Sequence, residues 1–177
     1  MAPDVTIFAA GYLVYISAAL AVVAAAILLR NVPRLTILRW IVSVIIMLVV
    51  AFALARVASA VYNDPRPFTQ DHVKPLIAHA ADNGFPSDHA LLGAAIVAAI
   101  LLLSPWWSIP FILAGVAVDW ARVGAGIHHV SDVVGSSVIV AIAILVALLA
   151  SPPLVRWLVP HLPASWIQDK SRSSPAA

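Results

Sequence analysis

Cysteine is absent from this sequence. Its absence excludes a disulfide framework, a metal site built on thiolates, and a cysteine nucleophile. Any nucleophile in this chain is therefore a side chain of another type.

Charged residues are also scarce. Only 10% of the 177 residues are Asp, Glu, Lys or Arg, whereas 63% are hydrophobic. The formal net charge is +2 and the basic residues lie scattered, so the sequence does not indicate nucleic-acid binding. Several apolar runs approach the roughly 20 residues that a helix needs to cross a bilayer. The composition therefore predicts an integral membrane protein that contacts membrane lipids.

The apolar runs predict an all-α fold, a polytopic transmembrane helical bundle with about five spans. A polar, proline-bearing loop with the small amphipathic piece PLIAHAA separates the second span from the third. Prolines break the segment after the last span, so we expect it to lie at the interface. We expect one membrane domain, residues 1–160, and a cytoplasmic tail, residues 161–177. The five expected spans are residues 6–29, 37–61, 87–104, 109–123 and 131–150.

Basic residues predict the orientation of the bundle. With five spans, the turn after the first span and the segment after the last lie on one face, and these hold Arg30, Arg34, Arg39, Arg156, Lys170 and Arg172. The positive-inside rule makes this face cytoplasmic. Polar residues at the span ends then meet on the opposite, extracytoplasmic face: Arg66, Ser87, Asp88, His89, Arg122, His128 and Asp132.

The stretch NGFPSDHALLGAA, residues 83–95, places polar side chains at the start of an apolar helix. Polar groups near hydrocarbon are costly and are usually kept for a function. Free amides at a helix start favour an anion. Arg66 and Arg122 can each offer a planar guanidinium to phosphate oxygens. The outer face therefore has the composition of a phosphate site.

His128 and Asp132 stand four residues apart, one turn of a helix. A carboxylate at this spacing can hold an imidazole in one tautomer and stabilise its cation, which suits a histidine nucleophile. His89, on another helix, can approach from the opposite side as a general acid. In-line phosphoryl transfer needs this division of roles with positive charge between the two.

Three motifs resemble those of a known family. They are RP at residues 66–67, PSDH at 86–89 and R-x5-H-x3-D at 122–132. In this order they resemble the signature motifs of the type 2 phosphatidic acid phosphatase superfamily. The segments PRPF, HAAD and FPSDHA are similar to the bacitracin-resistance type of undecaprenyl diphosphate phosphatase within it. The resemblance covers residues 62–135, and the flanking spans match only in hydropathy.

The resemblance implies an enzyme of the bacterial plasma membrane that needs no metal or cofactor. Its substrate would be a polyprenyl diphosphate, preferably undecaprenyl diphosphate, whose hydrolysis recycles the cell-wall lipid carrier and underlies bacitracin resistance. His128 would attack the terminal phosphorus, Asp132 would orient His128, and His89 would protonate the departing lipid phosphate. The implied phosphate-binding residues are Arg66, Ser87, Asp88, Arg122 and Arg56.

The sequence departs from the family pattern at the first motif. A lysine is expected seven residues before Arg66, where this chain has Ser59. Arg56, one helical turn earlier, is the nearest cation upstream and lies on roughly the same face. Two interpretations stay open: Arg56 replaces the lysine, or its guanidinium reaches the lipid headgroups.

Alternative hypotheses about the substrate, the function and the site also stay open. Lys74, His79 and Asp82, in the outer loop, are candidates for substrate contact, as His72 is. The lipid could instead be phosphatidic acid, phosphatidylglycerol phosphate or a lipid A phosphate.

A proton-coupled transporter would predict titratable groups at mid-bilayer and an internal repeat, neither of which the sequence shows. A metal site of His128, His129 and Asp132 is a further alternative, although the spacing favours His129 as a loop residue. The sequence does not indicate an oligomeric state.

Overall fold

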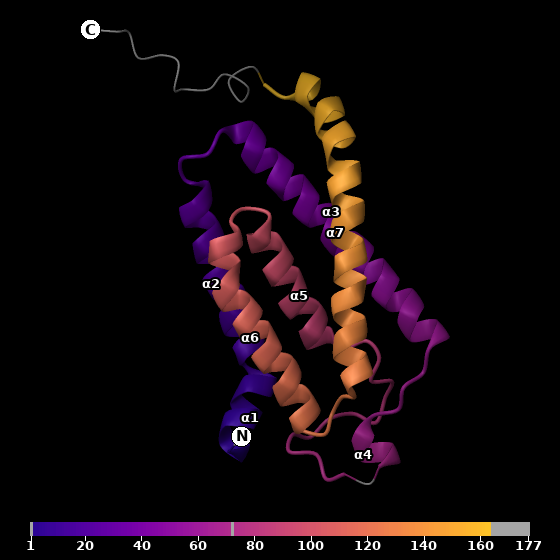
Figure 1. Ribbon diagram of the computed structural model, residues 1–177. Coiled ribbons are helices and arrows are strands. Elements are labelled where there is room, and N and C mark those ends of the chain that lie inside the picture. The colour runs from indigo at the N-terminus through magenta and orange to yellow at the C-terminus, as the bar shows by residue number, and fades with distance from the viewer. Residues whose placement is uncertain (1, 72, 164–177) are drawn as a thin grey trace, which may run out of the picture.

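The computed structural model describes residues 2–71 and 73–163, and within them every regular element is a helix. His72 and residues 164–177, which hold most of the expected tail, lie outside the described residues. The all-α bundle is confirmed (Figure 1). In chain order its elements are α1 (Pro3–Gly11), α2 (Leu13–Leu29), α3 (Arg34–Val61), α4 (Pro67–Gln70), α5 (Asp88–Leu101), α6 (Pro105–Gly124), α7 (Val130–Leu158) and a 3-10 turn (Val159–His161).

Two helices in the described part of the chain, α3 and α7, are long and apolar enough to cross a membrane. A third span results if α1 and α2 are counted as one bent pair. The chain is therefore a multi-pass membrane protein. α5 is an apolar helix of only 14 residues, and α6 has 20 residues. Five helical segments thus lie where five spans were expected: α1 with α2, α3, α5, α6 and α7. The number of them that crosses the bilayer stays a prediction.

The first expected span, residues 6–29, is not one straight helix. The chain bends by 49° between α1 and α2, at Tyr12. Gly11 stands immediately before this break, where its high conformational freedom weakens a helix. The bend leaves backbone carbonyls of α1 without their usual helical partners, and one of them contributes to the site described below.

Two helices extend beyond their expected ends. α6 begins at Pro105 rather than near residue 109, because Ser104 caps it by accepting from the Trp107 amide and proline is compatible with a first turn. α7 continues past residue 150 through Pro152 and Pro153 to Leu158. The expected interfacial segment therefore begins only after eight further helical residues. Each proline removes one backbone hydrogen bond, but a buried hydrogen bond from Ser43 of α3 to Ser151 ties this part of α7 to α3.

Small side chains fill the interior of the bundle, and large apolar side chains cover its flanks. A buried cluster between α3, α5 and α7 consists mainly of alanines, among them Ala51, Ala95 and Ala143. Small residues let membrane helices approach closely. In contrast, Phe52 is 70% exposed and Leu149 is 79% exposed. Small side chains in the interior and large apolar side chains on the outer surface are what a helical bundle surrounded by lipid requires.

The polar segments gather at one end of the bundle. Figure 1 shows α4, the starts of α5 and α7 and the ends of α3 and α6 together at this end, with the N-terminus. The turn between α2 and α3, which holds Arg30, and the far end of α7, which holds Arg156, lie at the opposite end, as the sequence predicts. Gly126, with φ of +72°, forms the turn that joins α6 to α7 at the polar end.

Candidate active site

A cavity of about 810 Å³ opens between α3, α5 and the loop over residues 62–86. One part of it is polar and the other is apolar, so it can hold a ligand that has a charged head and a hydrocarbon chain. The residues that line it are Tyr15, Leu48, Ala51, Phe52, Ala55, Arg56, Ser59, Arg66, His79, Asp82, Asn83, Phe85, Pro86, Asp88, His89, Leu91, Leu92, Ala95, Arg122 and His128.

His128 lies at the inner wall of this cavity, in the short connection between α6 and α7. Its side chain is 2% exposed. Nε2 accepts hydrogen bonds from Arg122 Nη2 at 3.0 Å and from Arg66 Nη1 at 3.2 Å. Because guanidinium groups can only donate, Nε2 carries a lone pair and the ring proton resides on Nδ1. That proton is donated to Asp132 Oδ2 at 3.1 Å.

The surroundings of His128 favour its neutral form. Burial is the largest influence and lowers the pKa of His128 below its ordinary value of 6.5. The hydrogen bond to Asp132 raises this pKa, and the charges of Arg122 and Arg66 lower it. A neutral imidazole whose Nε2 lone pair faces the cavity is a competent nucleophile or base.

Two buried arginines bring positive charge to Nε2 of His128. Arg66 is 5% exposed and also donates to the carbonyl of Ile127 at 2.9 Å and to Asp82 Oδ1 at 2.6 Å. Arg122 is 4% exposed and donates to the carbonyl of Ala10 at 3.1 Å. The bend between α1 and α2 makes this carbonyl available. Both guanidiniums are thus fixed by backbone carbonyls and point at the same ring nitrogen.

Asp132, in the first turn of α7, is completely buried. Its Oδ2 accepts from His128 Nδ1 and from the backbone amide of His129, the latter at 2.8 Å. Gly84 makes room for this oxygen, since a Cβ at residue 84 would stand 3.0 Å from it. Asp132 is therefore placed to orient the His128 ring, as its spacing predicts.

The residues that begin α5 reach the cavity unequally. His89 lines it and lies edge-on to Tyr15, with ring centroids 5.4 Å apart. Asp88 lines it with an exposed side chain. Ser87 is completely buried, its Oγ has no hydrogen-bond partner in the described chain, and it is not part of the cavity wall. The structure therefore does not bring Ser87 into the cavity wall with Asp88 and His89.

Among the candidate contacts of the outer loop that the structure describes, His79 and Asp82 reach the cavity. The His79 ring lies edge-on to His128 at a centroid distance of 6.3 Å. Burial and the Arg66 charge lower the pKa of His79. Burial works against the ionised form of Asp82, but the hydrogen bond from Arg66, the charge of Arg66 and a backbone hydrogen bond together outweigh it and lower the pKa of this carboxyl. Lys74 is exposed on the same loop and is not part of the cavity wall.

Arg56 lines the cavity from α3, next to Ser59, the residue at the position of the family's lysine. In the part of the chain that the structure describes, it makes no hydrogen bond or ion pair. It differs in this respect from Arg66 and Arg122, which are both engaged.

Several residues that hold the site together were not expected from the sequence. Asn83 donates to the carbonyls of Ser59 and Tyr62 and accepts from the amide of Asp64, so it ties the loop to the end of α3. Asn83 precedes Gly84, and an asparagine before a glycine indicates a turn. This pair is the sequence signal from which the role of Asn83 could have been found. Tyr15 had no sequence signal, because it comes from a span far away in the chain.

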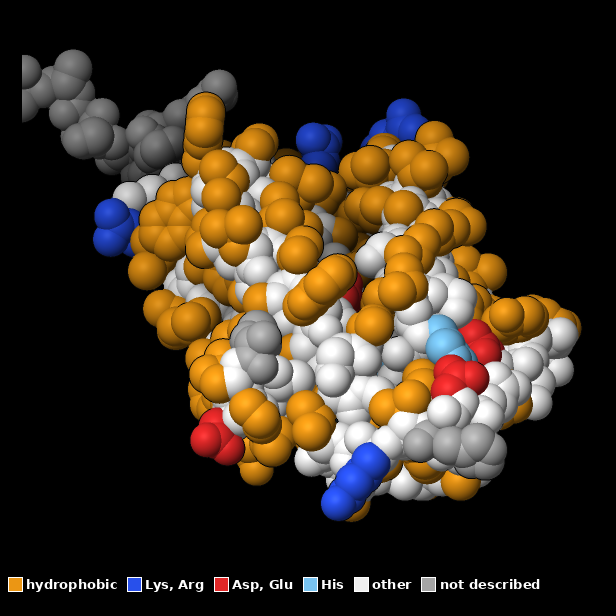
Figure 2. All heavy atoms as spheres, turned by 60° about the horizontal axis from the view of Figure 1, so that its bottom comes forward, with side chains coloured by type: hydrophobic (Ala, Val, Ile, Leu, Met, Phe, Trp, Pro, Cys, Tyr) orange, Lys and Arg blue, Asp and Glu red, His pale blue; other side chains and the backbone are white. Residues whose placement is uncertain are grey.

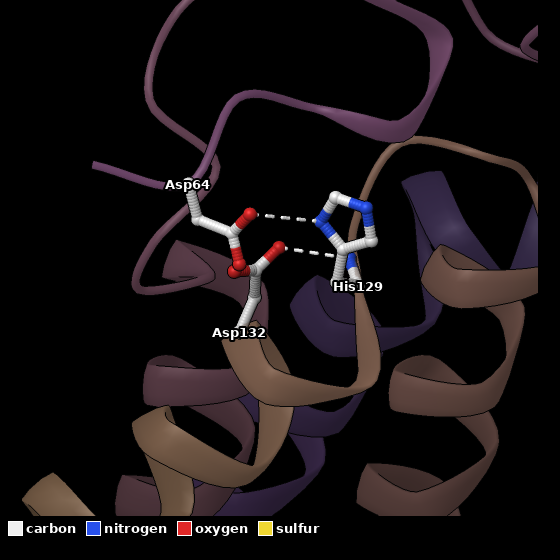
Figure 3. Close-up of side chains that lie close together, drawn as sticks. All are labelled: Asp64, His129 and Asp132. Atoms are coloured by element: carbon white, nitrogen blue, oxygen red, sulfur yellow. Dashed lines mark hydrogen bonds and ion pairs between the residues drawn. The ribbon is translucent and has the colours of Figure 1, made fainter. Parts of the chain in front are cut away.

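His129 is not a simple loop residue. It caps the start of α7, and its ring faces Asp64 at 3.2 Å and Asp71 at 3.6 Å. Figure 2 shows this end of the molecule, where acidic and histidine side chains gather in a small group among uncharged and apolar ones. The ligand atoms of Asp64, His129 and Asp132 lie within 4.8 Å of one another (Figure 3). Within the described chain, the group that could hold a metal is therefore Asp64, His129 and Asp132. It differs from the metal site considered in the sequence, which had His128 in the place of Asp64.

Comparison with known proteins identifies relatives of this chain. The family model described as the PAP2 superfamily matches residues 42–156. The undecaprenyl-diphosphatase BcrC of Bacillus subtilis (strain 168) is 40% identical over 82 residues, which are 46% of this chain and 42% of that protein. The bacitracin transport permease protein BcrC of Bacillus licheniformis is 30% identical over 111 residues, 62% of this chain and 55% of that protein.

A lipid A 1-phosphatase of Rhizobium etli (strain ATCC 51251 / DSM 11541 / JCM 21823 / NBRC 15573 / CFN 42) is 38% identical over 60 residues, 34% of this chain and 26% of that protein. No solved structure matches the chain. The chain thus spans about half the length, or less, of these relatives. The family match covers 115 of the 177 residues, from within α3 to the last turn of α7, and includes all three motifs. This chain belongs to the PAP2 superfamily.

Proposed function

We propose that this protein is a lipid diphosphate phosphatase that hydrolyses undecaprenyl diphosphate to undecaprenyl phosphate and inorganic phosphate. The observation that carries the proposal is the arrangement around His128. Its Nε2 faces the cavity between two guanidiniums and its Nδ1 faces a buried carboxylate. The name of the Bacillus subtilis relative supports the choice of lipid.

The first chemical step is attack by His128 Nε2 on the terminal phosphorus. Phosphate oxygens replace Nε2 as acceptors for Arg66 and Arg122, which stabilise the charge of the transition state. The bond between this phosphorus and the bridging oxygen breaks, and His89 donates a proton to that oxygen. Asp132 stabilises the ring while it carries positive charge. The products are the lipid monophosphate and a phosphohistidine at residue 128.

Water completes the reaction. With the lipid phosphate gone, neutral His89 can take a proton from a water molecule that attacks the phosphohistidine. The nitrogen–phosphorus bond breaks, inorganic phosphate leaves, and His128 returns to its starting form. This sequence consumes one water for each phosphate released and requires no metal.

The lipid chain would occupy the apolar half of the cavity, along α3 and α5. Leu48, Phe52 and Leu92 line this half and are at least one-third exposed, so it opens toward surrounding lipid. The loop that holds His79 covers His128, and we expect the segment PLIAHAA to act as a lid or tail guide. Unchanged lipid turnover after deletion of this segment would contradict that role.

The positions of the basic residues support an orientation in the membrane. Arg30 and Arg156 lie at the end opposite the cavity, and both are exposed. The positive-inside rule then makes the cavity end extracytoplasmic in a bacterial plasma membrane. Labelling of a cysteine introduced at the exposed Lys74 by a membrane-impermeant reagent, in intact cells, tests this orientation.

Phosphate release from undecaprenyl diphosphate in detergent with EDTA tests the function. We expect the wild type to be active, and His128→Ala to lose activity by about 10³-fold or more, because removal of a nucleophile leaves only the positioning of substrate. His129→Ala is the matched control, since the His129 ring faces Asp64 and Asp71 and does not line the cavity. Substrate labelled with ³²P at the terminal phosphate should label the wild type at histidine. Retained activity in His128→Ala would overturn the assignment.

Another lipid phosphate is the second candidate substrate, and the name of the Rhizobium etli relative favours it. The same site could act on a lipid A phosphate, phosphatidic acid or phosphatidylglycerol phosphate. Turnover of these lipids and of undecaprenyl diphosphate by one preparation, compared as kcat/KM, decides between them. The permease name of the Bacillus licheniformis relative would instead suit a transporter, for which lipid dephosphorylation should be absent.

A further inference from the structure

We propose that Arg56 binds the phosphate that stays on the lipid, so that the cavity selects diphosphates over monophosphates. This rests on the proposed function. The cavity then has two anion positions, one at Arg66, Arg122 and His128 for the transferred phosphoryl group, and a second at Arg56 for the leaving group.

The first observation is the lack of a partner for Arg56. Among the described residues it makes no hydrogen bond or ion pair, although it lies within the membrane helix α3. A cation in such a helix is costly and is usually retained for a function. Arg66 is already held by Asp82 and Ile127, and Arg122 by Ala10. Arg122 Nε also lacks a partner, but the rest of that guanidinium is held, whereas no nitrogen of Arg56 is bound among the described residues. Arg56 is therefore the cation of the cavity wall whose whole guanidinium is free for a ligand.

The second observation is where Arg56 stands along the cavity. On α3, Ser59 lies one turn nearer the polar end, where Asn83 binds it, and Phe52 lies one turn deeper. On the facing helix α5, His89 stands at the polar end and Ala95 lies deeper. Arg56 therefore marks the junction between the polar and apolar halves. A ligand whose chain fills the apolar half must pass Arg56 before its head reaches His128.

The order of groups in a lipid diphosphate matches this order of residues. The chain is followed by the inner phosphate and then by the terminal phosphate. If the terminal phosphorus is at His128, the inner phosphate lies on the side toward the chain, where Arg56 stands. A lipid monophosphate has no group for this position when its only phosphate is at His128. The match assigns Arg56 to the inner phosphate.

The chemistry gives this contact a use in the transition state. As the bond to the terminal phosphorus breaks, negative charge grows on the bridging oxygen and on the inner phosphate that carries it. His89 supplies the proton for the bridging oxygen, and the Arg56 guanidinium stabilises the remaining charge. A monophosphate ester releases an alcohol, so its turnover gains nothing from this contact.

Matched substrates test the proposal on the full-length protein in detergent. Farnesyl diphosphate and farnesyl monophosphate have the same chain and differ only in the inner phosphate. In Arg56→Gln we expect kcat/KM to fall about 10- to 100-fold for the diphosphate, the range for lost hydrogen bonds to a charged group. For the monophosphate we expect a change of less than about threefold, because no group occupies the Arg56 position. Arg56→Lys keeps the charge and should recover part of the loss.

The control is Arg39→Gln, which removes an exposed arginine from the other end of α3. It should leave both substrates within about twofold of wild type. Binding of farnesyl methylenediphosphonate, which cannot be hydrolysed, gives a readout without turnover, and its affinity should fall in Arg56→Gln but not in Arg39→Gln. If Arg56→Gln does not fold, the ratio of the two kcat/KM values in Arg56→Lys replaces it, with an expected fall of about threefold.

Each outcome decides the proposal. Equal losses for both substrates would place Arg56 at the transferred phosphate, in the role of the family's lysine, and would overturn the assignment. Unchanged kcat/KM values for both substrates would mean that Arg56 contacts the lipid headgroups instead of the substrate. This result would also overturn the assignment. Failure of the proposed function looks different: the wild type would not release phosphate from the diphosphate, or His128→Ala would remain active.

Discussion

The two ends of the bundle hold their charges in different ways. At the cavity end, Arg66, Arg122 and Asp132 are at most 5% exposed and are bound to His128. At the other end, Arg30 and Arg156 are exposed. A buried charge must be matched by specific partners, whereas an exposed one is stabilised by water or headgroups. Substitution of the buried charges at the first end should therefore have large effects, and substitution of exposed charges at either end should have small ones.

The largest effect in this comparison is expected from Asp132→Asn. The substitution keeps the size of the side chain but removes the charge that stabilises the His128 ring when it becomes positive. An amide can also present its N–H to Nδ1 and so favour the wrong tautomer. We expect the rate of phosphate release to fall by about 10³- to 10⁴-fold, as for comparable carboxylate–histidine pairs. Steady-state kinetics on undecaprenyl diphosphate measures it.

The matched control for Asp132→Asn is Asp64→Asn. Asp64 lies in the same group of side chains but faces His129 instead of His128. Its substitution should change the rate by less than about fivefold, the range for a partly exposed pair. A loss as large as that of Asp132→Asn, reversed by added divalent cation, would instead support a metal at Asp64, His129 and Asp132.

The residues around His128 could be predicted because they follow local patterns. The spacing between His128 and Asp132 is one helical turn, and the polar start of α5 is visible as a break in hydropathy. These signals need only a few neighbouring residues. The all-α fold follows in the same way from long apolar runs, whose backbone must satisfy its own hydrogen bonds in lipid.

The supports of the site could not be predicted, because they depend on contacts between distant segments. Arg122 binds the carbonyl of Ala10 only because the first span is broken at Tyr12. Asn83 binds the end of α3 across 24 residues of chain. The end of α7 was placed too early, because proline weakens an isolated helix and the compensating contact with α3 does not appear in the local sequence.

A smaller effect is expected from Asp82→Asn. Asp82 is 59% exposed and binds Arg66 Nε at 2.6 Å. A substrate phosphate that uses Arg66 must compete with this carboxylate. The substitution should therefore lower KM by about two- to fivefold and change kcat less, because a pair with one exposed member contributes at most about 1 kcal/mol.

Asp71→Asn is the control for Asp82→Asn, because Asp71 is another exposed carboxylate near this end of the bundle and faces His129 rather than Arg66. It should leave KM unchanged. A rise in KM for Asp82→Asn would show that Asp82 positions Arg66 for substrate instead of competing with it, and would bring Asp82 into the binding site.

The smallest effect concerns the protonation of His128, and it separates the influences of its neighbours. Burial, together with the charges of Arg122 and Arg66, lowers the pKa of His128 below 6.5, whereas the hydrogen bond to Asp132 raises it. A lowered pKa means that the ring loses its proton at a lower pH, so Nε2 stays unprotonated throughout the neutral range.

NMR titration of histidine-labelled protein, with His128→Gln used to assign the signal, should give a midpoint below 6.5. Arg122→Gln should raise this midpoint and Asp132→Asn should lower it. A midpoint above 6.5 in the wild type would mean that the carboxylate outweighs burial and both arginines, and that His128 is partly cationic before substrate binds.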